Sequence, residues 1–203
     1  MKDEYQSIAA DATASFKVEA SKFIASAFPV DSRVQAEETL AKVRKQYFDA
    51  THHCFAYALG SEGKEFRYSD GGEPSGTAGP KILAAIQSKG LSDILVVVTR
   101  YFGGTKLGTG GLGRAYFDSA SRALSEAVVV LKVVAEELQI TFSYDETSRV
   151  MNTLSHRKAK IIDTVYDEDV TLRISIRKSS AQLLADELVN VTRGNLAVKY
   201  RGT

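Results

Sequence analysis

The stretch that decides the fold is SDGGEPSGTAGPKILAAIQSKGLSDILVVVTRYFGGTKLGTGGLG, residues 69–113. It holds eleven of the fifteen glycines of the chain, most of them in two loops at residues 70–79 and 103–113. Glycine loses more conformational entropy on folding than other residues, roughly 0.5–1 kcal/mol where regular structure must be held. Simple turns do not require so many glycines. We therefore expect the backbone of these loops to come close to a ligand or to another stretch of backbone.

A helix and a buried strand are predicted between the two loops. Pro80 suits the first turn of a helix, Thr77 is a candidate N-cap, and Gly90 ends the helix. The run ILVVVT at residues 94–99 is continuously apolar, which is typical of a strand buried on both faces. A further helix is expected over residues 112–127.

The segments before the first loop alternate between strands and one amphipathic helix. The helix is predicted over residues 33–48, after a candidate N-cap at residues 31–32. Strand patterns cover residues 5–10, 15–19, 23–30, 53–59 and 66–68. Residues 128–134 are ambiguous between a last strand and a linker.

From residue 136 the pattern becomes strand, helix, strand, strand, helix, strand. Leu138, Ile140 and Phe142 alternate along the first of these strands, as on a sheet with one buried face. The order βαββαβ is the ferredoxin-like split pattern. We place the boundary near residue 133, so the predicted domains are residues 1–132 and 133–203.

Composition favours a soluble globular protein. The net charge of +1 gives no global argument for nucleic acid or membrane binding. The single cysteine, Cys54, excludes an internal disulfide framework and fits a reducing compartment. The N-terminal segment MKDEYQS has no apolar signal core, and no apolar run is long enough to span a bilayer. We expect a cytoplasmic protein without membrane contact.

Each glycine loop leads into a helix N-terminus, where free N–H groups attract anions. Asp93 is the one acidic residue between residues 81 and 114. The basic residues of this region are Lys81, Lys89, Arg100, Lys106 and Arg114. Two interpretations stay open: contact with an anion or polyanion, or tight turns with a solvated basic rim.

The spacing Gly108-x-Gly110-x-x-Gly113 matches the dinucleotide fingerprint. That fingerprint belongs at the start of a doubly wound sheet, and too little of the domain follows it here. No Gly-Lys-Ser/Thr sequence follows either. We do not predict a dinucleotide site.

Asp70 and Glu73 are candidates for an acid–base or metal-binding pair. A carboxylate there can instead accept backbone N–H bonds and cap the loop. Either carboxylate can also pair with Arg100, which would fix both loops and explain an arginine after so apolar a strand. If Arg100 does not form such a pair, it faces a ligand.

The run His52-His53-Cys54 suggests metal ligands, but neighbouring residues of a strand point to opposite faces. No second Cys or His cluster exists, so no metal site is predicted. A Cys54–His52 dyad is geometrically allowed, whereas a lone cysteine in a strand is typically a small buried hydrophobe. We predict no catalytic residue.

Tyr101 and Phe102 lie beside Arg100 and Lys106, which makes an aromatic and basic cluster. Bases of single-stranded RNA can stack on such side chains. Alternatively, the two rings end the buried strand and pack under the loops.

Two longer motifs run through these loops. They are Glu73-Pro74-Ser75-Gly76-Thr77-Ala78-Gly79 and Val97-Val98-Thr99-Arg100-Tyr101-Phe102-Gly103-Gly104-x-x-Leu107-Gly108. They resemble the signatures of the IMPACT family of YigZ/YvyE-like bacterial proteins, as do residues 21–24 and 50–53, and the resemblance covers nearly the whole chain. One departure is Gly71-Gly72 before Glu73, where many members carry an acidic residue beside the glycine, and this weakens a metal interpretation.

The resemblance implies an α+β fold. The N-terminal domain would have the ribosomal protein S5 domain 2-like α/β fold, a sheet with helices on one side. The C-terminal domain would be ferredoxin-like and similar to the last domain of elongation factor G. No established catalytic activity and no cofactor come with the family, and its eukaryotic relatives regulate translation through protein contacts.

We therefore expect a non-enzymatic binding protein linked to translation, with RNA, the ribosome or an acidic protein as its partner. The predicted contact residues are Asp70, Glu73, Ser75, Gly76, Thr77, Arg100, Tyr101, Phe102, Gly103, Gly104, Lys106, Gly108 and Arg114. The alternative is an enzyme or binder that acts on a phosphorylated small molecule or nucleotide at the same loops.

Overall fold

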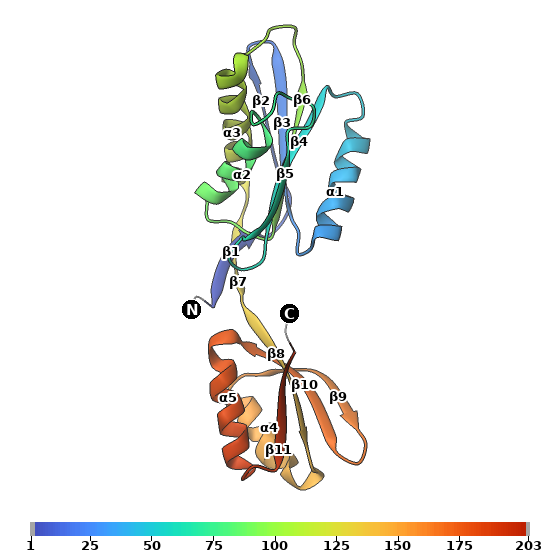
Figure 1. The fold of residues 1–203 in the computed structure, drawn as a ribbon, viewed down its shortest axis with the longest axis vertical. Coiled ribbons are helices and arrows are strands. Elements are labelled where there is room, and N and C mark those ends of the chain that lie inside the picture. The colour runs from blue at the N-terminus through green and yellow to red at the C-terminus, as the bar shows by residue number, and fades with distance from the viewer. Residues whose placement is uncertain (1–2, 202–203) are drawn as a thin grey trace. The chain divides into compact units, whose positions relative to one another are not determined.

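A computed structural model describes residues 3–201 of the chain, which divide into two compact units. One unit is Tyr5–Lys132, and the other contains Asp3, Glu4 and the described residues from Val133 onward. Both units combine helices with a sheet, so the predicted α+β class is confirmed (Figure 1). Within residues 3–201, none of the helices is long and apolar enough to cross a membrane.

The N-terminal unit is built on a five-stranded sheet of order β2-β3-β6-β4-β5. Its elements are β1 (Glu4–Ile8), β2 (Ala12–Val18), β3 (Ser21–Pro29), α1 (Arg33–Gln46), β4 (His52–Leu59), β5 (Glu65–Ser69), α2 (Gly79–Ser88), β6 (Ile94–Tyr101), α3 (Gly108–Glu126) and β7 (Val129–Val133). β6 is the central strand, antiparallel to β3 and β4, and its residues 94–100 are all buried. β1 and β7 pair in a separate two-stranded sheet, so the ambiguous segment at residues 128–134 contains a strand.

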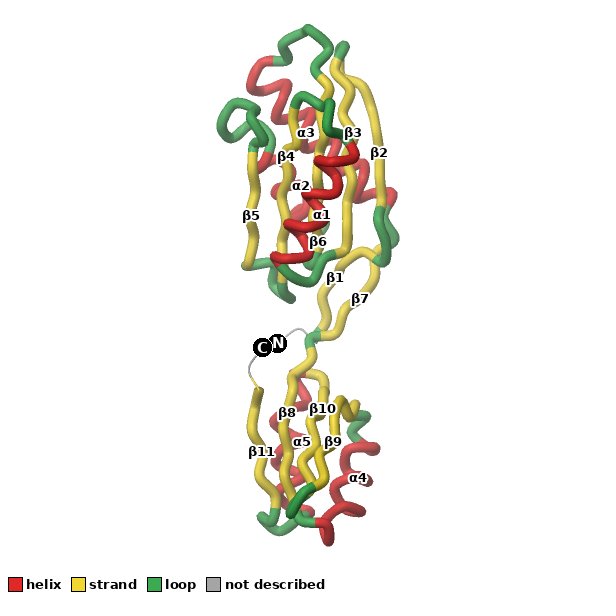
Figure 2. The backbone as a smooth tube through the Cα atoms, turned by 90° about the vertical axis from the view of Figure 1, so that its right-hand side faces the viewer, coloured by secondary structure: helices red, strands yellow, loops and turns green. Residues whose placement is uncertain are grey.

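Helices cover both faces of this sheet. On one face α1 packs against β4 and β6, with Leu40 among Phe55, Tyr57 and Val97. On the other face α2 and α3 pack over the alternate residues of the same strands. In Figure 2 α1 lies in front of the sheet and α2 and α3 lie behind it. The expectation of helices on one side was wrong, because β4 and β6 present apolar side chains on both faces and each face must be shielded from water.

The C-terminal unit is a four-stranded antiparallel sheet of order β11-β8-β10-β9 with two helices on one face. Its elements are β8 (Ala135–Phe142), the 3-10 turn η1 (Tyr144–Glu146), α4 (Thr147–His156), β9 (Lys160–Tyr166), β10 (Val170–Arg177), α5 (Lys178–Val191) and β11 (Leu196–Arg201). The residues that alternate with the core positions Leu138, Ile140, Leu172 and Ile174 lie on the face without helices. The predicted βαββαβ order is the one observed.

Close approach of two backbone segments explains part of the glycine content. A Cβ on Gly103 would lie 2.0 Å from the Ala20 carbonyl oxygen, and a Cβ on Gly71 would lie 2.3 Å from the His53 carbonyl oxygen. Gly110 differs, because nothing lies within 4 Å of its Cβ position and its φ is not positive. The helix predicted from residue 112 begins at Gly108, so Gly110 lies in the first turn of α3.

We expect opposite effects of alanine at the two kinds of glycine. Gly103→Ala should lower the free energy of unfolding by roughly 1–3 kcal/mol, because the backbone of Ala20 must move to admit a methyl group. Gly110→Ala should raise it by up to about 1 kcal/mol, because alanine is the better helix former. Urea unfolding monitored by circular dichroism measures both. Equal effects of the two substitutions would contradict the assignment.

Candidate functional site

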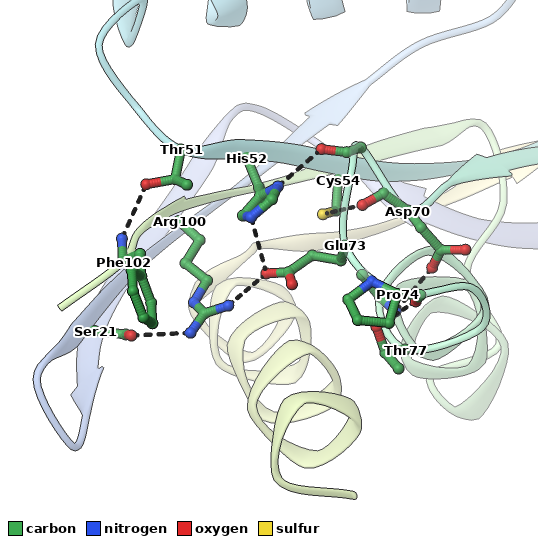
Figure 3. Close-up of polar contacts among 12 residues, drawn as sticks. Ser21, Thr51, His52, Cys54, Asp70, Glu73, Pro74, Thr77, Arg100 and Phe102 are labelled. Carbon is green, nitrogen blue, oxygen red and sulfur yellow. Dashed lines mark hydrogen bonds and ion pairs between the residues drawn. The ribbon is translucent and has the colours of Figure 1, made fainter. Parts of the chain in front are cut away.

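A buried ion pair joins the first glycine loop to the end of β6. Arg100 Nη1 donates to Glu73 Oε1 at 2.6 Å, and the two side chains are only 4% and 3% exposed. Arg100 Nη2 donates to Ser21 Oγ at 3.0 Å, and the Tyr116 hydroxyl donates to the same Glu73 oxygen at 2.8 Å. Figure 3 shows Glu73 between Arg100 and His52. Of the partners left open for Arg100, Glu73 is the one observed.

The surroundings of Arg100 enclose its guanidinium group. The group lies 5.4 Å from the ring centroid of Phe23 and 5.3 Å from that of Phe102. Its Nε has no hydrogen-bond partner within residues 3–201. On the other side of Glu73, His52 Nε2 lies 3.8 Å from the carboxylate, and His52 Nδ1 lies 3.1 Å from the Gly71 carbonyl oxygen. Arg100 is therefore engaged in holding the loop.

Asp70 closes the first loop over the start of α2. Its Oδ2 accepts the N–H of Gly76, and its Oδ1 accepts those of Ala78 and Gly79, each at 2.9 Å. Burial alone would raise the pKa of the Asp70 carboxyl, but these three N–H groups outweigh burial and lower it below 3.8. The anion site expected at this helix N-terminus is thus filled by a carboxylate of the chain itself.

Thr77 does not cap α2 as predicted. The N-cap position is Ala78, and the Thr77 hydroxyl donates to the Pro74 carbonyl oxygen at 2.6 Å. The oxygen that accepts the N–H groups at the start of α2 comes instead from Asp70, which lies eight residues before Ala78 in the sequence. Asp70 and Glu73 therefore have separate roles in the loop, one on backbone N–H groups and one on an arginine.

Cys54 lies beneath this loop as a buried thiol. It is 0% exposed, and its Sγ donates to the Asp70 carbonyl oxygen at 2.9 Å. Burial raises the pKa of Cys54 to about 12, so the thiol is protonated at neutral pH. The His52 ring contacts Gly71 and Glu73, and the Cys54 thiol donates to Asp70. Within the described residues the two side chains therefore do not form a Cys54–His52 dyad.

The second loop is open to solvent. Phe102 is 44% exposed, with one side of its ring near Arg100, and its N–H donates to Thr51 Oγ1 at 3.0 Å. The Gly103 N–H donates to Ser21 Oγ at 3.3 Å. The expectation that the ring packs under the loops therefore holds only in part for Phe102, and base stacking on its exposed side stays a prediction. Tyr101 is half-buried, and its hydroxyl donates to Asp49 at 2.8 Å.

The N-terminus of α3 differs from that of α2. Its N-cap residue is Leu107, it has no side-chain cap within the described residues, and its first turn contains no acidic residue. Lys106 and Arg114 are exposed, and neither has an ion-pair partner in residues 3–201. The Lys81 side chain reaches the same end of α3, since a Cβ on Gly113 would lie 3.3 Å from Lys81 Cε.

The remaining predicted residues lie in the loops or at the start of α3. Ser75 and Gly76 are exposed in the first loop. Gly104 in the second loop and Gly108, the first residue of α3, have positive φ angles of 91° and 68°. Sequence reasoning missed Tyr116 as a polar partner of Glu73. Its place in the apolar stripe of α3 indicated core packing and gave no signal for the role of its hydroxyl.

Comparisons with known proteins place the chain among relatives of similar length. The family model described as "Impact N-terminal domain" matches residues 19–124, and the one described as "Domain of unknown function (DUF1949)" matches residues 140–195. The chain is 33% identical to IMPACT family member YvyE of Bacillus subtilis, over 90% of this chain and 84% of that protein. It is 32% identical to IMPACT family member YigZ of Escherichia coli, over 93% of each. A solved structure described as "Crystal structure of an hypothetical protein" matches with a TM-score of 0.78 and 30% identity, over 100% of this chain and 99% of that one.

Arg100→Met should be strongly destabilising, because it leaves the Glu73 carboxylate buried without its partner. We expect the free energy of unfolding to fall by about 3–5 kcal/mol. The double variant Arg100→Met/Glu73→Gln should lose less than the sum of the single losses, because the two side chains interact. Urea unfolding measures both, with Arg114→Met as the control, which should change stability by less than about 0.5 kcal/mol. An unchanged Arg100→Met stability would refute a structural role.

Asp70→Asn should change the dependence of stability on acid pH. Because the folded-state pKa of Asp70 lies below its ordinary value of 3.8, the stability that it contributes is present above that value and is lost as pH falls through the folded pKa. The variant should be less stable than the wild type at neutral pH, and the two curves should converge in acid. The lowered pKa of Asp93 is common to both proteins and cancels in the difference. A difference that is independent of pH would contradict the capping role.

Proposed function

The chain belongs to the IMPACT family, and from this premise we propose that it is a non-enzymatic binding protein of the translation apparatus that contacts RNA phosphate through its second glycine loop. Family membership supports a role related to the regulation of translation in general. The finer proposal, contact with RNA or the ribosome, rests on the geometry at the start of α3.

The observation that carries the proposal is the uncapped N-terminus of α3 beside three basic side chains. The N–H groups of a first helical turn need acceptors, and α3 offers them none from its own side chains. Gly110 keeps this backbone bare, although the fold around it would accommodate a methyl group. Lys106, Arg114 and Lys81 add positive charge at the same end. This combination favours an anion.

Phe102 gives the loop a platform for a base. Its backbone is fixed by Thr51, and one side of its ring lies near Arg100, which the buried pair with Glu73 holds in place. The exposed part of the ring is free to stack on an unpaired base. A phosphate on the α3 N-terminus and a base on Phe102 together suit single-stranded RNA.

The carboxylates and the thiol near this loop are engaged in the fold, which favours binding over catalysis. Asp70 accepts three backbone N–H bonds, Glu73 is paired with Arg100, and Cys54 is buried and protonated. Binding that depends on phosphate contacts should weaken with salt, because each contact releases counterions from the RNA.

The test compares a basic-loop variant with a matched control. Lys106→Gln/Arg114→Gln should reduce affinity for a short single-stranded RNA and for purified ribosomes. If each side chain contacts one phosphate, the slope of log K against log salt should fall by about 0.7 for each lost contact. Lys42→Gln/Lys45→Gln makes the same charge change on α1, which lies on the opposite face of the sheet, and should leave binding unchanged. Fluorescence anisotropy at several salt concentrations gives both quantities.

Phe102→Leu tests the stacking step separately. It should weaken RNA binding by about 1–3 kcal/mol and leave the salt slope unchanged, because an apolar side chain without a ring cannot stack. Circular dichroism would confirm that each variant is folded. No binding by the wild type, or equal binding by the basic-loop variant and its control, would reject the RNA proposal and favour an acidic protein or a phosphorylated small molecule as partner.

A further inference from the structure

The sheet of the C-terminal unit leaves one face without helices. Its core side chains point to α4 and α5, and the alternate positions of the four strands form a polar face. A shallow hollow of about 180 Å³ lies in this face. The residues that line it are Gln139, Asp163, Val165, Thr171, Arg173 and Arg201. This volume is below the roughly 300–1,000 Å³ of drug-sized ligand sites, so the hollow suits only a small polar group.

Arg173 is the lining residue of this hollow that carries a buried polar atom without a hydrogen bond. It stands in β10 between Gln139 of β8 and Asp163 of β9. Its Nε is buried and makes no hydrogen bond within residues 3–201, and no ion pair to Asp163 forms. Buried polar atoms in folded proteins are nearly always bonded, so an unsatisfied guanidinium nitrogen calls for a ligand or an ordered water.

The local geometry of the sheet supports the same conclusion. The register between β10 and β9 shifts between Arg173 and Ile174, so one residue of β9, Ile162, is left without a partner. Bulges of this kind bend a strand and re-aim side chains, and they are over-represented next to functional sites. Here the irregularity falls directly at Arg173.

We infer that this hollow binds the phosphate group of a small phosphorylated molecule. Arg173 and Arg201 supply two guanidinium groups against the single carboxylate of Asp163, so the lining carries a net positive charge. A guanidinium fork matches two phosphate oxygens with charge-assisted hydrogen bonds, and the Gln139 amide adds donors. No aromatic side chain is among the lining residues, so the hollow lacks a stacking platform for the bases of a nucleic acid.

Removing the charge of Asp163 should change the affinity in a direction that depends on the charge of the ligand. Its Oδ1 accepts the N–H of Thr164, and its carboxylate shares the hollow with the two arginines. A bound phosphate is repelled by this negative charge, so Asp163→Asn should strengthen phosphate binding. A ligand that instead presents an ammonium group to Asp163 would bind more weakly to the same variant.

The experiment is a titration of the full chain, labelled with ¹⁵N, with inorganic phosphate and with ribose 5-phosphate at constant ionic strength. We expect the backbone amide signals of Gln139, Arg173 and Arg201 to shift with both probes. Arg173→Gln should lower the affinity by about tenfold or more, because a hydrogen bond to a charged group is lost. Lys199→Gln is the matched control, since Lys199 lies on the same face beside Gln139 but does not line the hollow. It should change affinity by less than about twofold.

Several results would overturn the inference. Shifts that avoid the lining residues, equal affinity of the Arg173→Gln and Lys199→Gln variants, or weaker binding by Asp163→Asn would each do so. Binding of an RNA strand in the hollow without binding of either phosphate probe would also overturn it. The outcome is independent of the RNA proposal, because Lys106→Gln/Arg114→Gln should bind both phosphate probes here as the wild type does.

Discussion

The ion pair between Glu73 and Arg100 is the constraint on which the N-terminal unit depends. It joins the first glycine loop to the central strand, and the same two side chains recruit Ser21 from β3 and Tyr116 from α3. Two buried charges are costly unless further hydrogen bonds satisfy them, and these neighbours supply such bonds. The loops held by this pair also pack closely against neighbouring backbone at Gly71 and Gly103. A side chain at either glycine would push the two backbone segments apart.

The two glycine loops begin helices in different ways, and this difference separates structure from proposed function. At α2 the chain places its own carboxylate, Asp70, on the free N–H groups, so that end is complete in the isolated protein. At the start of α3 no side chain of the described residues caps the helix, its first turn contains no acidic residue, and basic side chains lie nearby. The positive end of the α2 dipole is thus neutralised by Asp70, whereas the positive end of the α3 dipole faces solvent.

Much of the fold was predictable because periodicity reports burial. The apolar run of β6 and the alternation in β8 led to the observed strands, and an arginine after so apolar a strand led to its pairing with a carboxylate. The start of α3 was not predictable, because glycines signal loops although the helix runs through them. The cap from Asp70 was one of the alternatives that the sequence offered, and it is the one observed, whereas the hydroxyl contact of Tyr116 depends on long-range packing, which local pattern does not encode.

The single thiol of the protein lies under the first loop, where it donates a hydrogen bond to the Asp70 carbonyl oxygen. Alkylating reagents require a thiolate in contact with solvent, and burial denies Cys54 both conditions. Its modification must therefore wait until the loop lifts away from β4. The rate at which Cys54 is labelled therefore measures how often the first loop opens locally, and the native protein already contains this probe.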